Sequence, residues 1–170
     1  MSSEHGVSSE AGNARGATEK YMTFKLGAEE YGLEILKVRE LIGLLEITRV
    51  PRTPEFIRGV INLRGKVIPV VDLRVKFGME AALATSQSVI IVVQLGTTAA
   101  GLTMGILVDE VVEVRAIAGE DVEPPPNFQT QAAADFILGI GKAEKRIIFL
   151  LDIDRVLTAP EVSRVADVTG

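Results

Sequence analysis

The sequence has no cysteine and no tryptophan, and aromatic residues make up only 5% of its 170 residues. Without cysteine the chain forms no disulfide bond and uses no thiolate in catalysis, which suits a reducing compartment. Apolar residues nevertheless account for 47% of the chain, enough for a sizeable core. Because so few of them are aromatic, that core must be built from Val, Ile and Leu, and the β-branched members of this set favour strands.

Long apolar runs are also missing. No window approaches the roughly 18 uncharged apolar residues of a membrane-spanning helix, and residues 1–19 have Ser, Glu, Gly and Asn where a secretory signal needs an apolar stretch. We therefore expect a soluble, cytosolic protein that does not insert into membranes. Residues 1–19 are expected to form a disordered tail. His5, the only histidine, lies in that tail with no second metal ligand nearby.

The formal net charge of −5 argues against general nucleic-acid binding, which requires a basic field. The charge is unevenly distributed along the chain. Residues 37–76 contain nine Lys or Arg and four Asp or Glu, a net charge of +5, whereas residues 109–123 contain six acids and one Arg, a net charge of −5. These segments are either ordinary solvated surface or complementary patches for different partners.

Short strand patterns, separated by Gly, Pro or charged residues, occupy most of the chain after residue 20. The pattern predicts about ten strands, near residues 21–26, 30–33, 47–50, 59–63, 67–72, 88–95, 101–108, 111–115, 136–140 and 146–152. This spacing is typical of barrels or sandwiches. Ten short strands divide naturally into two five-stranded barrels, so the predicted fold class is all-β with a few short helices.

Helical signals are few. Residues 34–45 place apolar side chains at the i, i+3, i+4, i+7 spacing of one buried face, which predicts a helix. Single helical turns are expected at residues 54–58, with Thr53 as N-cap, and at residues 152–157, ending before Pro160. Residues 159–170 are expected to form a flexible C-terminal tail.

The most informative segment is residues 59–77, two apolar β-type runs joined by a polar turn. Alternation places Asn62 and Arg64 on one face and Ile61 and Leu63 on the other. Gly65 supplies the positive φ that a tight reversal needs. An arginine and an asparagine side by side, with no nucleophile or general base nearby, indicate a binding surface rather than a reaction centre.

Together with residues 31–40 and 48–54, this segment resembles the CheW-type chemotaxis coupling proteins. Residues 105–111 and 150–153 fall where that family has matching segments, so the resemblance covers roughly residues 20–158. It implies two SH3-like five-stranded β-barrels packed through a shared apolar layer. Within a CheW-like domain of residues 20–158, a linker is expected near residues 79–88, and strands from the two ends of the chain are free to interleave.

The resemblance also implies a function. The family consists of non-enzymatic adaptors, without cofactors, that couple chemoreceptors (methyl-accepting chemotaxis proteins) to a CheA-type histidine kinase at membrane receptor arrays. A groove between the barrels receives the helical-hairpin tip of the receptor, and the positions that match the groove residues are Val38, Glu40, Gly59, Asn62, Leu63 and Arg64. Phe128, at the end of a stiff triple-proline loop, is implied as an anchor for the regulatory domain of the kinase.

The residues alone leave other interpretations open. Arg64 could pair with Glu40 and only brace the fold, and Phe128 could plug the second barrel instead of binding the kinase. The same module could serve another chemosensory route, such as surface motility or gene regulation. A β-barrel that binds nucleic acid through residues 37–76 is a more distant alternative, since the net charge is acidic and aromatic residues for base stacking are scarce there.

Patterns typical of enzymes are absent. The carboxylate pairs Asp109/Glu110 and Asp152/Asp154 have no His or Lys constellation around them. Residues 139–141 lack the third glycine and the following helix of a phosphate-binding loop. No metal-ligand spacing and no nucleophile motif occur. The sequence therefore predicts a protein that is not an enzyme.

Overall fold

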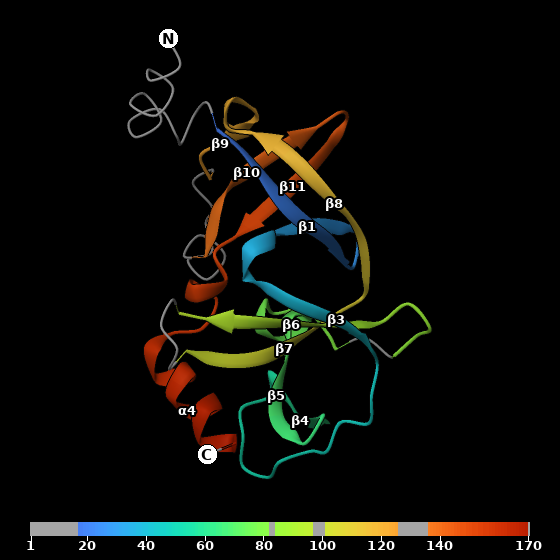
Figure 1. The fold of residues 1–170 in the computed structure, drawn as a ribbon, viewed down its shortest axis with the longest axis vertical. Coiled ribbons are helices and arrows are strands. Elements are labelled where there is room, and N and C mark those ends of the chain that lie inside the picture. Colours follow the sequence, from blue (N-terminus) through green and yellow to red (C-terminus); the bar gives the residue numbers. More distant parts are fainter. Residues whose placement is uncertain (1–16, 82–83, 97–100, 126–135, 170) are drawn as a thin grey trace.

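The computed structural model describes residues 17–81, 84–96, 101–125 and 136–169. Most of the tail expected at residues 1–19 and the whole segment around Phe128 therefore lie outside the described residues. Within the described part, no helix is long and apolar enough to cross a membrane. The chain forms two β-sheets that lie one above the other in Figure 1.

The two sheets divide the chain unevenly. The six-stranded barrel has the strand order β8-β1-β2-β11-β10-β9 and combines both ends of the chain. Its strands are β1 (Thr18–Leu26), β2 (Glu29–Glu34), β8 (Glu110–Ala118), β9 (Val122–Glu123), β10 (Ile137–Ala143) and β11 (Arg146–Leu151). The five-stranded barrel has the order β3-β6-β7-β5-β4. Its strands are β3 (Val38–Gly43), β4 (Ile57–Leu63), β5 (Lys66–Asp72), β6 (Val89–Leu95) and β7 (Leu102–Val108).

These sheets confirm the predicted fold class, an all-β protein of two packed barrel units with a few short helices, although one sheet has six strands rather than five. The helical elements are η1 (Ile35–Lys37), α2 (Leu73–Lys76), η2 (Gly119–Asp121), η3 (Ile153–Arg155) and α4 (Ala159–Thr169). The expected domain boundaries stay a prediction.

A shared apolar layer lies between the barrels, and each barrel also has an apolar centre of its own. The shared layer takes Phe24 and Leu33 from the six-stranded barrel and Ile91 and Val93 from the other. Ile90, the next residue of β6, belongs instead to the centre of the five-stranded barrel. Successive strand residues point to opposite faces. An uninterrupted apolar run such as residues 89–93 therefore marks a strand buried on both faces.

The prediction of a helix at residues 34–45 is wrong. Only η1 is helical there, and the chain continues as β3, which pairs with β6. A bulge explains the misleading pattern, because Val38 pairs with Val93 and Glu40 pairs with Val92, leaving Arg39 as the extra residue. This extra residue shifts the apolar alternation by one position, so a bulged strand resembles a helical face in sequence.

Two other local predictions also need correction. The strand predicted at residues 47–50 reduces to a single bridge between Thr48 and Val60, since Pro51 has no N–H to continue a ladder. The turn predicted at residues 54–58 closes with one hydrogen bond from the Ile57 N–H to the Pro54 carbonyl, and β4 follows at once. The Thr53 hydroxyl donates to the Val50 carbonyl instead of capping a helix.

The C-terminal segment also differs from expectation, because residues 159–169 form helix α4 rather than a flexible tail. The helix, shown at the end of the chain in Figure 1, begins with a capping box. The Glu161 carboxylate accepts from the Thr158 N–H at 2.7 Å, and the Glu161 N–H donates to the Thr158 hydroxyl at 3.3 Å. Val165 is fully buried against the rest of the protein. Pro160, expected to end a helical turn, lies in the first turn of α4.

Candidate functional site

The predicted site residues lie where the five-stranded barrel closes. Strands β3 and β4 are at the two ends of the strand order, and the segment after β3 returns along β4. Thr48 and Val60 exchange two backbone hydrogen bonds of 2.8 Å. Gly59 permits this approach, because it has φ +148° and a Cβ there would lie 2.2 Å from the Thr48 carbonyl oxygen. Gly59 is buried, so its observed role is to let the barrel close.

The turn between β4 and β5 presents Arg64. Leu63 pairs with Lys66, so Arg64 and Gly65 form a two-residue loop. Their φ angles are +52° and +88°, and two positive values are typical of a type I′ hairpin turn. The positive φ predicted for Gly65 is present, while that of Arg64 was not anticipated. The Asn62 Oδ1 accepts a hydrogen bond of 2.9 Å from the Gly65 N–H, which holds the turn in this shape.

The Arg64 guanidinium faces Glu40 on β3. Its two terminal nitrogens donate to the two carboxylate oxygens at 2.5 and 3.1 Å. The hydrogen bond from Arg64 lowers the pKa of Glu40, and the same bond raises the pKa of Arg64. The Arg64 side chain is still 69% exposed, and that of Glu40 is 32% exposed. The pair therefore braces the barrel and also presents unused N–H groups to solvent.

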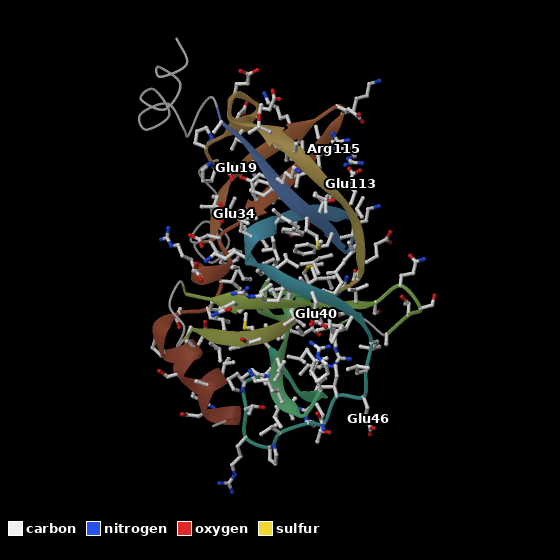
Figure 2. The ribbon with its side chains drawn as sticks, viewed as in Figure 1. Glu19, Glu34, Glu40, Glu46, Glu113 and Arg115 are labelled. Atoms are coloured by element: carbon white, nitrogen blue, oxygen red, sulfur yellow. The ribbon has the colours of Figure 1, made fainter. Side chains whose placement is uncertain are left out.

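The remaining predicted residues are less exposed or lie elsewhere. Val38 packs against the shared apolar layer, and Leu63 packs against the centre of the five-stranded barrel. Asn62 is exposed beside the turn. The structure thus brings Glu40, Asn62 and Arg64 together. Val38 precedes the bulge in β3, where it pairs with Val93 of the shared apolar layer. Figure 2 labels Glu40 on this strand, which crosses the middle of the molecule.

One exposed apolar residue of β3 was missed. Leu41 pairs with Ile91, whose side chain belongs to the shared layer, yet Leu41 is 42% exposed. It therefore adds apolar surface where the two barrels meet. The helix predicted for this segment would have placed Leu41 on a buried face. Two further leucines, Leu44 and Leu45, are similarly exposed and line a pocket of about 240 Å³ at the end of this strand.

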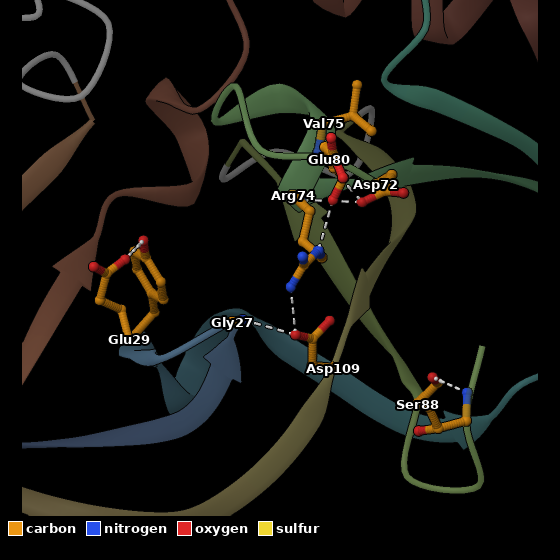
Figure 3. Close-up of polar contacts among 10 residues, drawn as sticks. Gly27, Glu29, Asp72, Arg74, Val75, Glu80, Ser88 and Asp109 are labelled. Carbon is orange, nitrogen blue, oxygen red and sulfur yellow. Dashed lines mark hydrogen bonds and ion pairs between the residues drawn. The ribbon is translucent and has the colours of Figure 1, made fainter. Parts of the chain in front are cut away.

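An arginine–aspartate contact joins the two barrels near this pocket. Figure 3 shows Arg74 between Asp109 and the backbone of Glu80. Arg74 donates to the Asp109 carboxylate at 2.8 Å and to the Glu80 carbonyl at 2.8 Å. The same carboxylate accepts from the Gly27 N–H at 2.7 Å, in the turn between β1 and β2. Asp109 therefore ties the six-stranded barrel to α2 and helps to fix the angle between the barrels.

Many charged residues of the basic segment 37–76 and the acidic segment 109–123 form ion pairs within the fold. Three basic residues of the 37–76 segment pair with acids outside it, in the pairs Lys37–Asp154, Arg74–Asp109 and Lys76–Glu161. Two others pair with acids of the same segment, in the pairs Arg58–Asp72 and Arg64–Glu40. In the acidic segment, Glu113 pairs with Arg115 and Arg146, and Glu123 pairs with Lys142. This arrangement does not favour a continuous basic surface for nucleic acid.

The carboxylates that an enzyme would need have structural partners. Asp152 accepts from the Asp154 N–H, and Asp154 pairs with Lys37 and accepts from the Gly96 N–H. Among the described residues, no group of three or more His, Asp or Glu side chains could hold a metal ion. The exposed pair beside β3, with apolar side chains around it, is suited to binding another macromolecule.

Comparisons with known proteins agree with this description. The family described as CheW-like domain matches residues 20–161. Chemotaxis protein CheW of Klebsiella aerogenes is 38% identical over 162 residues, which cover 95% of this chain and 94% of that protein. Chemotaxis protein CheW of Rhizobium meliloti is 36% identical over 140 residues, which cover 82% of this chain and 88% of that protein.

A solved structure shows the same fold. The crystal structure of scaffolding protein TtCheW from Thermoanaerobacter tengcongensis is similar with a TM-score of 0.74 at 38% identity, covering 84% of this chain and 94% of that one. The family match spans most of the sequence, and the fold, the hairpin with Asn62 and Arg64, and the relatives all agree. This chain belongs to the CheW-like family.

Proposed function

We propose that this chain, a chemotaxis scaffold protein of the CheW-like family, is a non-enzymatic adaptor that couples chemoreceptors to a CheA-type histidine kinase. The observation that supports this most is the exposed Glu40–Arg64 pair, held on two strands beside partly exposed apolar side chains. Such a surface binds a partner without making or breaking covalent bonds. The adaptor would act by favouring one kinase conformation, so its effect is limited by its differential affinity for the two states.

The receptor side of the proposal uses the surface around β3 and the β4–β5 turn. A receptor tip is a pair of amphipathic helices, which needs apolar area and a few fixed hydrogen-bonding groups. Arg64 and Glu40 would supply the polar contacts, and Val38, Leu41 and Leu63 the apolar ones. Gly59 and Asn62, also expected in the groove, would contribute chiefly by shaping the closure and the turn.

The kinase side of the proposal rests on the family alone. Phe128 lies outside the described residues, so its role as an anchor for the regulatory domain of the kinase stays a prediction. Recruitment to receptor arrays at the membrane is likewise a proposal that follows from receptor binding. Co-purification would identify the receptors that bind this chain.

The experiment that tests the receptor site is co-sedimentation with receptor-containing membranes, with and without the kinase. Arg64→Ala and Val38→Ala should weaken sedimentation with receptor while the folded fraction and kinase binding are retained. Arg49→Ala is a matched control, since Arg49 is an exposed arginine outside every ion pair of the described residues. Receptor binding that is unchanged in both site variants would overturn the assignment of this surface.

A further inference from the structure

A second open site lies on the six-stranded barrel, away from the surface assigned to the receptor. It is a cavity of about 400 Å³ at one mouth of that barrel. Its apolar walls include Ile117, Val122 and Leu138, and its polar groups come from Glu19, Tyr21 and Glu34. Cavities of this size with apolar walls and a few convergent polar groups are typical of ligand sites.

Strand register brings the polar groups together. Glu19 and Tyr21 are two residues apart on β1 and so point to the same face. Tyr21 pairs with Glu34 on β2, and Glu19 pairs with Ile117 on β8. Two carboxylates and a phenol therefore converge over the apolar side chain of Ile117. Figure 2 shows Glu19 and Glu34 on one flank of this barrel and Glu113 with Arg115 on the other.

The polar groups of this cavity lack partners within the described part of the chain. Tyr21 is only 6% exposed and lines the cavity, yet its hydroxyl makes no hydrogen bond to a described residue. Neither Glu19 nor Glu34 takes part in an ion pair there. The nearby cations are already used, since Lys37 lies 2.7 Å from Asp154 and Arg115 lies 2.9 Å from Glu113. Among the described residues, the buried side-chain atoms without a partner are Glu30 Oε2 and Arg146 Nε, so water can reach the Tyr21 hydroxyl, and Glu19 is exposed. A ligand that displaces this water would find three acceptors that the described part of the chain does not use.

Electrostatics agree with this geometry. Burial raises the pKa of Glu34, and the charge of Glu19 raises it further. Burial also raises the pKa of Tyr21, with additional contributions from Glu34 and then Glu19. Both pKa shifts reflect partial desolvation and the negative charges of neighbouring carboxylates. A bound cation would offset those charges.

We propose that this cavity binds an organic cation carried on an apolar stem, namely an ammonium or guanidinium group. The carboxylates of Glu19 and Glu34 accept its N–H groups, the Tyr21 hydroxyl accepts one more, and Ile117, Val122 and Leu138 cover the stem. The same chemistry is carried by a Lys or Arg side chain of a partner protein and by a free amphiphilic amine. This site is separate from the proposed receptor surface and does not depend on it.

The test is a titration of the full chain by two-dimensional NMR. Hexylammonium, neutral hexanol and a capped Gly-Gly-Arg-Gly-Gly peptide are the three probes. Saturable shifts of the backbone amides at residues 19, 34, 117 and 138 are expected for the two cations. Replacing both Glu19→Gln and Glu34→Gln should weaken cation binding about tenfold or more, as expected when charge-assisted hydrogen bonds are lost. Glu46→Gln, at a distant exposed acid labelled in Figure 2, should leave binding unchanged.

Each outcome of the titration either supports or overturns the proposed cation site. Tighter binding of the peptide identifies a partner side chain as the ligand, tighter binding of hexylammonium identifies a free amine, and both support the site. Hexanol binding as tightly as hexylammonium, unsaturable shifts, or equal cation binding by the double variant and the parent would overturn it. The dispersion of the amide spectrum of the double variant shows whether it is folded. If it does not fold, the single variants Glu19→Gln and Glu34→Gln replace it, each expected to weaken binding by about threefold or more.

Discussion

Arg64 and Glu40 form a two-hydrogen-bond ion pair between segments at opposite ends of one strand order. Glu40 lies on β3 and Arg64 directly follows β4, so only the closure of the barrel brings them together. The pair is exposed, and exposed ion pairs contribute little to stability. The Arg64 side chain is 69% exposed and keeps unused N–H groups, which suits recognition better than bracing alone.

Exchanging the two charges should separate bracing from recognition. In the double variant Glu40→Arg with Arg64→Glu, an ion pair can re-form, so the thermal midpoint should stay close to that of the parent. Receptor binding should not recover, because the donors and acceptors then occupy each other's positions. Thermal unfolding and membrane co-sedimentation measure the two effects. Full recovery of receptor binding would show that the pair acts only as a brace.

Replacing Gly59 should destabilise the fold rather than alter a contact surface. Gly59→Ala places a Cβ 2.2 Å from the Thr48 carbonyl oxygen at a φ of +148°. We expect a loss of about 3 kcal/mol, which lowers the thermal midpoint of a domain of this size by roughly 6–12 °C. Gly43→Ala is the control, because a Cβ there meets no atom within 4 Å. A Gly59→Ala protein as stable as the Gly43→Ala protein would contradict this reading.

Asn62 should stabilise the turn that carries Arg64. Asn62→Ala removes the acceptor of the Gly65 N–H, so we expect a loss of about 1 kcal/mol and faster hydrogen exchange at the Gly65 amide. Asn62→Asp keeps an acceptor oxygen and should retain most of the protection. Urea denaturation and amide exchange measure these effects. Equal exchange rates in the Ala and Asp variants would show that the side-chain acceptor does not hold the turn.

Glu34 should make stability depend on pH. Burial raises its pKa above the ordinary value of 4.5, so its contribution is fully present below that value and is lost as the pH rises through the folded-state pKa. Glu34→Gln removes this loss. The variant should be more stable than the parent at about pH 7 by roughly 0.5 kcal/mol or less, and the difference should shrink below about pH 4. Denaturant titrations across this range measure it. A variant less stable at neutral pH would contradict the expected sign.

Glu161 should anchor helix α4. Burial opposes its ionisation, but hydrogen bonds from Lys76 and Thr158 outweigh that effect and lower its pKa. Glu161→Ala removes one half of the capping box and both bonds to Lys76, so we expect a loss of about 1–2 kcal/mol. The contribution should be present above the ordinary pKa and fade as the pH falls through the lowered one. Glu120→Ala, at an exposed acid outside the ion pairs of the described residues, is the control in urea denaturation. Equal losses in both variants would contradict an anchoring role.

Several features were predictable because they depend on neighbouring residues. The runs of Val and Ile at residues 67–72 and 88–95 indicated strands, and these strands are present as β5 and β6. Gly65 indicated the reversal between β4 and β5, and its φ is +88°. The Thr158–Glu161 spacing carried a capping signal for α4 that was overlooked in favour of composition.

Other features depended on residues distant in the sequence. Val38 and Leu41 had the spacing of a helical face, and only pairing with β6 made that segment a bulged strand. The positive φ of Arg64 follows from the register of the hairpin, and the closeness of Thr48 to Gly59 follows from closure of the barrel. Local propensities are worth less than the burial and hydrogen bonds that such pairings provide.

The sequence by itself determined the all-β character of this protein, the hairpin that bears Asn62 and Arg64, and its membership of the CheW-like family. Short-range alternation and turn chemistry are written in adjacent residues, so they can be read there. Only the tertiary structure decided that Glu40 meets Arg64 and that Glu19, Tyr21 and Glu34 share one cavity. Those contacts join separate strands, and their geometry exists only after the sheets have paired and closed.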